Sequence, residues 1–282
     1  MSDEAIDGPG AFLPGRVAVV TGGGGGIGAA TAQLLAAHGA HVVVAEIDAA
    51  RGNATVDEIR GAGNDASLVV TDVRVDDDVF ALRDHVLAQH GRIDVLVNNV
   101  GHWVRNAGDF VDTEPGLWDE LYDVNFGHVL SVTHAFLPSM IERRSGSVIN
   151  VSSVEGLRGY PVDPVYGALK AAVVHFTRCL AVQVGNHGVR VNGIGPDVTE
   201  SLQVPYSRWV PPEQEGMWPV WVPIGRVGTA ADQARVVLFL ASDLSAFVTG
   251  HTIPTDGGTG AAGGWFRSTS RRGGWTNRPT AP

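Results

Sequence analysis

Short apolar segments alternate with segments of helical spacing along most of this chain of 282 residues. Strands that are apolar on both faces are typical of parallel sheets covered by helices on both sides. We expect such strands at residues 16–21, 40–46, 67–71, 93–98, 147–151, 189–194 and 251–255. Helices are expected at 27–38, 49–61, from Asp76 onward, and at 115–142, 164–186 and 230–240. The sequence therefore predicts an α/β fold built on a parallel sheet.

Two segments interrupt this alternation, and both carry tryptophans. Residues 197–228 contain several prolines, and residues 260–282 are rich in Gly and Arg. Because a tryptophan carries a large apolar area, we expect both segments to find a burial site, the first as a substrate loop. The predicted organisation is a flexible extension over residues 1–14, a catalytic domain over 15–259 and a C-terminal tail over 260–282.

Composition and charge exclude several classes of protein. A hydrophobic content of 44% and a charged content of 18% are those of a soluble globular enzyme. The net charge of −10 argues against binding of nucleic acid. Without a signal peptide or an apolar run long enough to span a membrane, the chain is expected to be cytoplasmic. The ten histidines lack ligand spacing, which predicts no catalytic metal, and Cys179 is expected to be a buried, inert thiol.

A glycine-rich stretch separates the first expected strand from the first expected helix. Glycines let the backbone approach a pyrophosphate, and a helix N-terminus supplies amide donors and a positive potential. The stretch reads Thr21-Gly22-x-x-x-Gly26-Ile27-Gly28. Its position between a strand and a helix predicts a dinucleotide site.

Glu46 ends the second expected strand, about twenty residues after the glycines. At this spacing an acidic residue accepts the ribose hydroxyls of NAD, whereas a 2′-phosphate would be repelled. The glycine loop also contains no Lys or Arg to pair with such a phosphate. The sequence therefore favours NAD over NADP.

Tyr166 and Lys170 are four residues apart on an expected helix and therefore share one face. A neighbouring ammonium is expected to lower the pKa of the phenol, so that it can transfer protons near neutral pH. Ser153 follows an expected strand, at the edge where open α/β sheets bind ligands. These residues predict a proton-transfer site beside the dinucleotide.

Together these motifs resemble those of the short-chain dehydrogenase/reductase family over residues 15–259. The matching residues are the glycine stretch, Asp72-Val73, Asn98-Asn99-Val100-Gly101, Asn125, Ser153, Tyr166-x-x-x-Lys170, Val191-Asn192 and Pro196. The resemblance implies a single-domain Rossmann fold with a parallel sheet of about seven strands, helices on both faces, and a homotetramer.

The resemblance also implies the members of the site. The catalytic set is Asn125, Ser153, Tyr166 and Lys170. The cofactor set is Gly22, Gly25, Gly26, Ile27, Gly28, Glu46, Ile47, Asp72, Val73, Asn99, Val100, Gly101, Tyr166, Lys170, Pro196, Asp197, Thr199 and Ser201. In such a site Ser153 holds the substrate oxygen, Tyr166 moves its proton, and Lys170 holds the nicotinamide ribose. Asn125 bends its helix and seats a water that relays protons.

The chain departs from the family pattern at two motif positions. Val100 replaces the usual Ala, a small change in packing that we expect to be tolerated. Asp197 replaces the usual Gly after Pro196, which places a carboxylate near the nicotinamide end and changes the local backbone turn.

The substrate side is expected at His102–Trp103, residues 155–163 and residues 200–225, where apolar side chains dominate. We therefore expect hydride transfer between NAD(H) and an apolar or cyclic secondary alcohol or ketone, whose identity and direction of reaction the sequence leaves open. One alternative is an NADPH-dependent 3-oxoacyl-carrier-protein reductase, which Glu46 opposes. Another is a non-catalytic redox sensor, which the complete catalytic set opposes. The tail over 260–282 is expected to pack across a subunit interface and to help cover a substrate pocket.

Overall fold

The structure is a computed structural model that describes residues 11–102, 109–201, 203–267 and 275–276. Within these residues, seven parallel strands form one sheet in the order β3-β2-β1-β4-β5-β6-β7. The strands are β1 (Val17–Thr21), β2 (His41–Glu46), β3 (Ala66–Val70), β4 (Val95–Asn98), β5 (Gly146–Val151), β6 (Val189–Pro196) and β7 (Thr252–Thr255). The predicted doubly wound α/β fold is confirmed.

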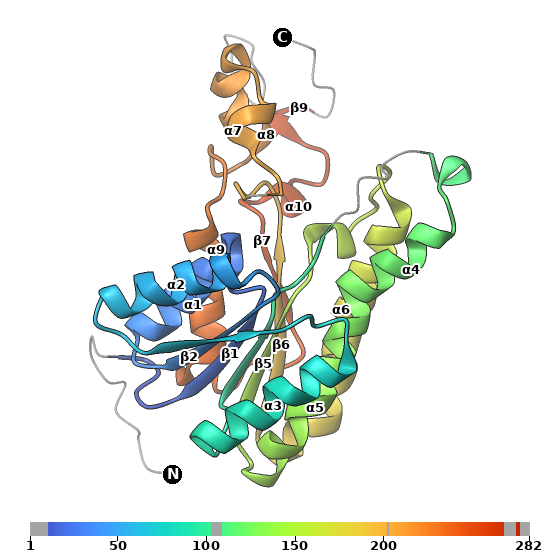
Figure 1. Ribbon diagram of the computed structural model, residues 1–282. Helices are drawn as coiled ribbons and strands as arrows, with labels where there is room; N and C mark the ends of the chain where they lie inside the picture. The colour runs from blue at the N-terminus through green and yellow to red at the C-terminus, as the bar shows by residue number, and fades with distance from the viewer. Residues whose placement is uncertain (1–10, 103–108, 202, 268–274, 277–282) are drawn as a thin grey trace.

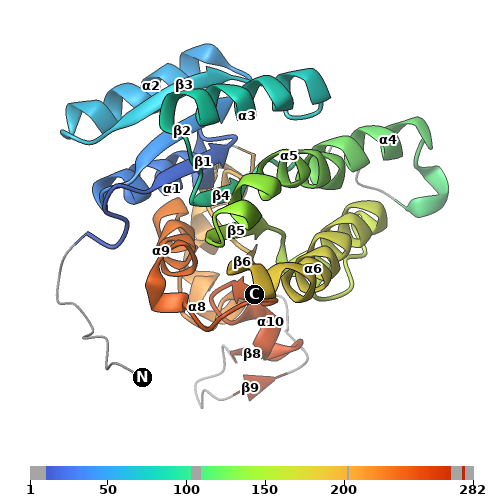
Figure 2. The same ribbon diagram turned by 90° about the horizontal axis from the view of Figure 1, so that it is seen from below.

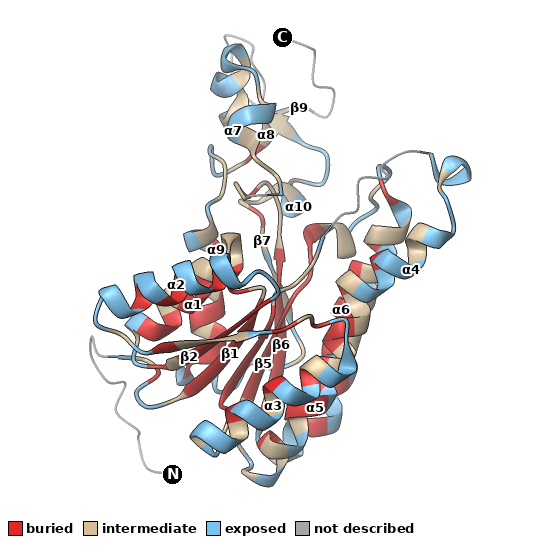
Figure 3. Cartoon of the chain, in the orientation of Figure 1, coloured by how far each residue is buried: buried red, intermediate tan, exposed pale blue. Residues whose placement is uncertain are grey.

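Helices cover both faces of this sheet, as Figures 1 and 2 show. Side chains of α1 (Gly26–Ala37), α2 (Ala49–Gly61) and α9 (Ala230–Ala241) form the core on one face. Side chains of α3 (Asp76–His90), α5 (His128–Glu142) and α6 (Pro164–Val184) form the core on the other. Burial is concentrated in the strands and on the helix faces toward them (Figure 3). This arrangement explains why the strands are apolar on both sides.

The order of strands reverses between β1 and β4, so the segments that follow these two strands diverge on either side of a crevice. Such a switch point is where open α/β sheets bind ligands. Gly22 follows β1 and Asn99 follows β4, and the backbone amide of Asn99 donates to the Thr21 hydroxyl at 3.0 Å. The fold therefore brings the glycine stretch and the segment after β4 to one place.

The long helix expected over 115–142 is interrupted. It consists of α4 (Gly116–Tyr122), a π-helical turn at Asp123–Gly127, and α5. Within this turn the Asn125 side chain donates to the Leu121 carbonyl at 3.0 Å. The wider turn lets a polar side chain enter the helix backbone, which is typical of functional sites.

Helix α6 differs from expectation in two ways. With the turn Gly185–His187 it is long and apolar enough, by length and composition, to cross a membrane. Its apolar residues are needed because it covers the sheet, and it also carries the buried Lys170. Cys179 lies on its outer face and is exposed, so the expectation of a buried thiol is wrong.

Residues near both ends of the described chain pack against the rest of the fold. Residues 1–10 lie outside the described part, but Leu13 is fully buried and its amide donates to the His38 carbonyl at 2.9 Å. Residue 13 therefore packs against the domain. In the tail, β8 (Phe266–Arg267) pairs with β9 (Trp275–Thr276), and β8 packs against α8 (Trp218–Trp221) of the same chain. The remaining tail residues, 268–274 and 277–282, lie outside the described part.

The substrate loop over 197–228 forms a separate cap above the sheet, which Figure 1 shows around α7 and α8. It consists of α7 (Tyr206–Trp209), a 3-10 turn at Pro212–Met217, and α8. After it come α9 and β7, and then α10 (Thr259–Ala262). The cap stands over the edge of the sheet at which β5 and β6 end.

Candidate active site

A cavity of about 880 Å³ opens at the carboxyl edge of the sheet, where the predicted site residues meet. The predicted residues that line it are Gly22, Gly25, Gly26, Ile27, Glu46, Ile47, Asp72, Val73, Asn99, Val100, Gly101, Ser153, Tyr166, Lys170, Pro196, Asp197, Thr199 and Ser201. Two do not line it. Gly28 packs against Gly22, and Asn125 bonds the backbone of His102, so both contact residues that line the cavity.

The glycine stretch forms one end of the cavity, and its geometry explains the glycines. Gly22 has φ of 62°, a left-handed conformation that side chains rarely adopt. A Cβ on Gly28 would lie 2.1 Å from the Gly22 carbonyl, so this turn can close only around a glycine. No side chain caps the N-terminus of α1, whose first residues face the cavity, so its amides are available to an anionic group. The stretch therefore fits the pyrophosphate of a dinucleotide.

Asn99 holds this end together. Its side-chain amide donates to the carbonyls of Thr21 and Gly22, at 3.0 and 3.2 Å. Val100, which replaces the usual Ala, is partly buried and packs against the core of the α3, α5 and α6 face. The replacement is thus accommodated by ordinary apolar packing.

Glu46 lies buried at the end of β2 and its carboxylate is already bonded within the protein. It accepts hydrogen bonds from the Gly24 amide at 3.0 Å, the Asp48 amide at 3.1 Å and the Arg51 guanidinium at 3.0 Å. Arg51, half-exposed on α2, also lines the cavity. Although the glycine loop contains no basic residue, Arg51 therefore supplies a cation to the part of the cavity around Glu46.

A second acid–arginine pair lies next to the first. Asp72 accepts two hydrogen bonds from the Arg74 guanidinium, at 2.8 and 2.6 Å, and these bonds lower the pKa of Asp72. Both residues line the cavity. Sequence reasoning identified Glu46 and Asp72 but missed their arginine partners, because neither arginine belongs to a motif.

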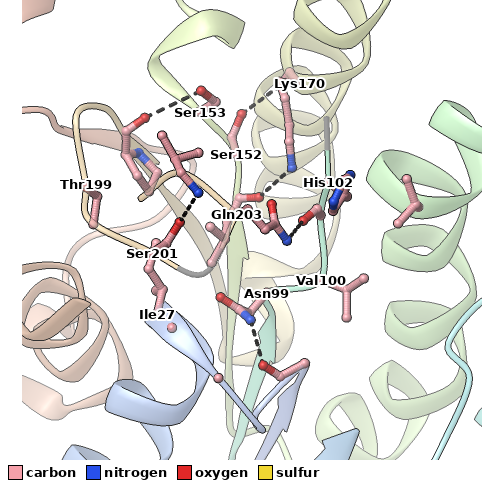
Figure 4. Close-up of a pocket in the computed structure, with 18 of the residues that line it drawn as sticks. Ile27, Asn99, Val100, His102, Ser152, Ser153, Lys170, Thr199, Ser201 and Gln203 are labelled. Carbon is pink, nitrogen blue, oxygen red and sulfur yellow. Dashed lines mark hydrogen bonds between the residues drawn. The ribbon is translucent and has the colours of Figure 1, made fainter. Parts of the chain in front are cut away.

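The proton-transfer residues lie at the other end of the cavity. Figure 4 shows Ser153 and Lys170 at this end and Ile27 and Asn99 at the opposite end. Asp163 caps α6 and accepts from the Tyr166 amide at 3.0 Å, which fixes where the helix begins. The Lys170 ammonium lies 5.6 Å from the centre of the Tyr166 ring and donates to the Val151 carbonyl at 3.3 Å. The predicted Ser153, Tyr166 and Lys170 are thus brought together.

The pKa values of this pair differ from the sequence-based expectation. Burial raises the pKa of Tyr166 above its ordinary value, and hydrogen bonding with Ser153 opposes this rise only in part. Burial lowers the pKa of Lys170 to about 8. The expected lowering of the Tyr166 pKa by Lys170 is not found, because loss of water around the phenol is the larger effect.

Asn125 holds the loop after β4 by hydrogen bonds to its backbone. Its side-chain amide nitrogen donates to the His102 carbonyl at 2.8 Å, and its oxygen accepts from the His102 amide at 3.2 Å. A Cβ on Gly101 would lie 2.7 Å from the Lys170 nitrogen, so the glycine leaves the space that the ammonium occupies. Asn125 therefore positions the segment that covers Lys170.

Asp197 turns the chain without the usual glycine. Its carboxylate accepts from the Val198 amide at 2.9 Å, from the Arg158 guanidinium at 3.2 Å and from the Thr259 hydroxyl. The left-handed conformation falls on the next residue, since Val198 has φ of 29°, which is uncommon for a β-branched side chain. Arg158 also pairs with Glu155 at 2.8 Å, so its charge is balanced by two carboxylates.

The remaining predicted polar residues have partners within the protein. Thr199 accepts from the Gln233 side chain at 2.9 Å and donates to the Asp197 carbonyl at 2.6 Å. The Ser201 hydroxyl accepts from the Val204 amide at 3.0 Å. These bonds fix the start of the substrate loop.

Aromatic side chains of the cap and of the loop before α6 line the cavity near Ser153 and Tyr166. Tyr160, Tyr206 and Trp209 line the cavity, and Tyr206 packs edge-on against Trp218 with 5.7 Å between ring centres. His102 also lines it, whereas Trp103 lies outside the described residues. Gln203 falls within the predicted range 200–225, and its side chain donates to the Gly101 carbonyl at 2.9 Å, which joins this loop to the segment after β4.

In the described residues no group of three or more His, Cys, Asp or Glu side chains could hold a metal ion. The polar groups at the substrate end are hydroxyls, an ammonium and paired carboxylates. Such a set can hold an oxygen atom and move a proton on or off it.

Comparisons with known proteins agree with this fold. A family model described as enoyl-(acyl carrier protein) reductase matches residues 22–260. The chain is 35% identical over 248 residues to a 3-oxoacyl-(acyl-carrier-protein) reductase of Chlamydia muridarum, covering 88% of this chain and 98% of that protein. It is 37% identical over 244 residues to cis-4-hydroxycyclohexanecarboxylate dehydrogenase of Sinomonas cyclohexanicum, covering 86% and 96%. The crystal structure of levodione reductase is similar with a TM-score of 0.83 and 32% identity, covering 89% of this chain and 99% of that one.

Lys170 is the only lysine in the sequence, so its titration can be followed alone. With lysine labelled with ¹³C at Cε, NMR should show one signal with a midpoint near pH 8, far below the ordinary 10.5. Because the unfolded chain then binds more protons than the folded chain between these pH values, stability should rise with pH across this window. Across this window the free energy of unfolding of the wild-type protein should rise by about 3 kcal/mol more than that of Lys170→Met. A midpoint above pH 10 would contradict the burial of this ammonium.

Proposed function

The chain belongs to the short-chain dehydrogenase/reductase family, and we propose that it transfers a hydride between NAD(H) and an apolar or cyclic secondary alcohol or ketone. Membership establishes the broader activity, that of a nicotinamide-dependent oxidoreductase acting on CH–OH or keto groups. The observation that carries the narrower proposal is one cavity that joins the glycine stretch to Ser153, Tyr166 and Lys170.

The dinucleotide fits the described residues. The uncapped N-terminus of α1 and the glycines would hold its pyrophosphate, and Glu46 its adenosine ribose. Lys170 would hold the nicotinamide ribose, opposite Thr199 and Ser201. When bound, the nicotinamide ring accepts or donates the hydride.

The substrate oxygen is handled by the chain's own residues. Ser153 binds the oxygen through its hydroxyl and thereby aligns it with Tyr166. In ketone reduction the Tyr166 phenol gives its proton to this oxygen, and in alcohol oxidation the phenolate takes the proton away. Lys170 supplies positive charge near the phenolate as it forms.

The protonation states of Tyr166 and Lys170 affect whether reduction or oxidation is favoured. Because burial raises the pKa of Tyr166, the resting site carries a phenol that can donate its proton, the state required for reduction. Oxidation requires the phenolate, so its rate should rise with pH until Lys170 loses its charge.

The cap and the loop before α6 favour a substrate with an apolar ring. Tyr160, Tyr206 and Trp209 present aromatic surface to the cavity, and Arg158 is already paired with two carboxylates. The named relatives include a dehydrogenase of a hydroxylated cyclohexane carboxylate and a reductase named for levodione. These features support a cyclic alcohol or ketone.

NAD is proposed as the cofactor because Glu46 is buried where a 2′-phosphate would lie, and its charge would repel one. A second candidate is NADPH in a 3-oxoacyl-carrier-protein reductase. Arg51 and Arg74 beside the two acids favour it, as do the relatives that bear that name. The net charge of −10 opposes docking of an acidic carrier protein. A redox sensor without catalysis would have no use for the complete proton-transfer set.

We also propose that the protein is a cytoplasmic homotetramer. Exposed apolar side chains on the described surface, including Val182 and Phe247, would be covered by neighbouring subunits. Analytical ultracentrifugation at micromolar concentration tests the assembly, and a monomer would contradict it.

Tyr166→Phe should reduce turnover of a secondary alcohol by roughly 10²- to 10⁴-fold, because the proton-transfer group is lost and the ring remains. Affinity for the dinucleotide should stay within about threefold of wild type. The matched control is Tyr160→Phe, whose ring lies 6.1 Å from that of Tyr166 and which should keep most of the turnover. If Tyr166→Phe keeps more than a few per cent of wild-type turnover, the assigned role is wrong.

Titration calorimetry should give a dissociation constant for NAD at least about tenfold below that for NADP, since repulsion of a phosphate costs more than about 1.4 kcal/mol. Glu46→Gln should narrow this gap by removing the charge. Arg51→Ala, the control, should leave NADP binding weak if Arg51 serves only to pair with Glu46. Equal affinities in the wild type, or tighter binding of NADP, would support the second candidate.

A further inference from the structure

Three charged side chains form a connected group beside Ser153. Arg158 donates to the Glu155 carboxylate at 2.8 Å and to the Asp197 carboxylate at 3.2 Å, and we call these three residues the ion triad. The Ser153 hydroxyl accepts from the Glu155 amide at 3.2 Å and donates to the Pro196 carbonyl at 3.5 Å, one residue before Asp197. Both acids are therefore anchored next to the hydroxyl that is assigned to the substrate oxygen.

The two carboxylates and the guanidinium of the triad differ in where they lie. Glu155 and Asp197 both line the cavity, and their side chains are 13% and 12% exposed. Arg158 is 40% exposed and is not among the described residues that line the cavity. The cavity wall beside Ser153 therefore presents the acids, and their cation lies toward solvent.

The ion triad carries one net negative charge, because two carboxylates share one guanidinium. Its other hydrogen bonds come from a backbone amide and a hydroxyl, which are neutral. The Lys and Arg residues that line the cavity in the described part are Arg51, Arg74 and Lys170. Both arginines pair with acids at the cofactor end, and Lys170 donates to a backbone carbonyl. The charge of the triad is therefore not cancelled by an ion pair with any of these three cations.

Uncharged aromatic rings complete this end of the cavity. Burial raises the pKa of Tyr206 to about 12, and the charge of Asp197 adds to the rise. Burial also raises the pKa of Tyr160. This ring lies near Glu155, because a Cβ on Gly167 would be 3.3 Å from the Tyr160 Cβ and 3.4 Å from the Glu155 carbonyl. Both phenols stay neutral at physiological pH, and the faces of neutral aromatic rings attract apolar rings and cations rather than anions.

We propose that Glu155 and Asp197 are specificity-determining residues, which reserve this cavity for cyclic alcohols and ketones without a negative charge. A carboxylate or phosphate on the substrate ring would be repelled by the ion triad, whose own cation is already paired. An uncharged ring keeps the aromatic contacts without this repulsion. The inference rests on the proposed function and narrows its substrate class. It also gives a role to Asp197, at which the chain departs from the family pattern.

Two ketones of nearly equal shape test the effect of charge. 4-Oxocyclohexanecarboxamide and 4-oxocyclohexanecarboxylate are reduced with NADH near neutral pH, a direction in which the nicotinamide ring starts without a charge. The value of kcat/KM for the amide should exceed that for the carboxylate at least about tenfold, the effect of one charge close to a partly buried site. Equal values in the wild-type protein overturn the proposal.

Charge variants should move this preference in opposite directions. Asp197→Asn and Glu155→Gln each leave the triad neutral, so the preference for the amide should fall roughly tenfold in whichever of the two folds. Arg158→Gln leaves two negative charges, so the preference should rise by a similar factor. The control is Glu200→Gln, whose carboxylate binds Ser207 and is not among the described groups that line the cavity, and which should keep the preference within about twofold. A purely structural role would slow both ketones alike, and an unchanged ratio in the triad variants overturns the proposal.

A binding measurement separates this inference from the proposed function. Cyclohexanecarboxamide and cyclohexanecarboxylate, which have no group to reduce, are titrated into the enzyme with NADH or NADPH, whichever binds, and followed by the fluorescence of the reduced nicotinamide. The amide should bind at least about tenfold more tightly, and Asp197→Asn should bring the two dissociation constants within about threefold. If neither ketone is reduced, the proposed function fails and these dissociation constants decide on the triad. Equal dissociation constants, or no binding of either compound, overturn the inference whether or not the ketones react.

Discussion

The site depends on a single buried ammonium. Lys170 is 3% exposed and is the only lysine in a chain whose other nineteen basic residues are arginines, out of 20 Lys and Arg in total. Burying a charge is costly unless polar groups surround it. The loop after β4, the π-helical turn and the end of β5 all contribute to its surroundings, and Gly101 gives it space. The structure around Lys170 is therefore built to hold a charge where the dinucleotide and Tyr166 meet.

This arrangement extends beneath the active site as a row of buried polar side chains. Asn98 donates to Thr133 and to Asn150, and Asn150 donates to Thr177, each at 2.9 Å. These bonds tie β4 and β5 to α5 and α6, and α6 carries Lys170. Polar pairing of this kind fixes the register of packed elements more strictly than apolar contact, because a slip would leave buried groups unpaired. The position of Lys170 thus follows from the packing of the whole face.

Much of the fold could be predicted from local pattern. The apolar strands and the helices between them follow from periodicity, and α2 begins and ends where predicted, at Ala49–Gly61. Most motif residues reached one cavity because they follow strands of the same parallel sheet, and Tyr166 and Lys170 reach it from α6. What could not be predicted depends on neighbours distant in sequence. Examples are the hydrogen bond that the Thr259 hydroxyl donates to Asp197 and the one that Gln203 donates to the Gly101 carbonyl.

Two other predictions were wrong because the burial of a side chain cannot be read from its neighbours in sequence. Cys179 sits in an apolar helix, but its face of that helix is turned outward. The pKa of Tyr166 was judged from its spacing to Lys170, whereas loss of water around the phenol decides the direction.

The central claim is that this cavity passes a hydride directly between the carbon of a secondary alcohol and a nicotinamide ring. The most direct measurement is to incubate the enzyme with NAD and a cyclic secondary alcohol that carries deuterium on its carbinol carbon. Mass spectrometry and NMR of the recovered cofactor should then show one deuterium at C4 of the reduced nicotinamide, on a single face. Reduced cofactor without deuterium, or none formed across a panel of cyclic alcohols and the corresponding ketones, would contradict the account.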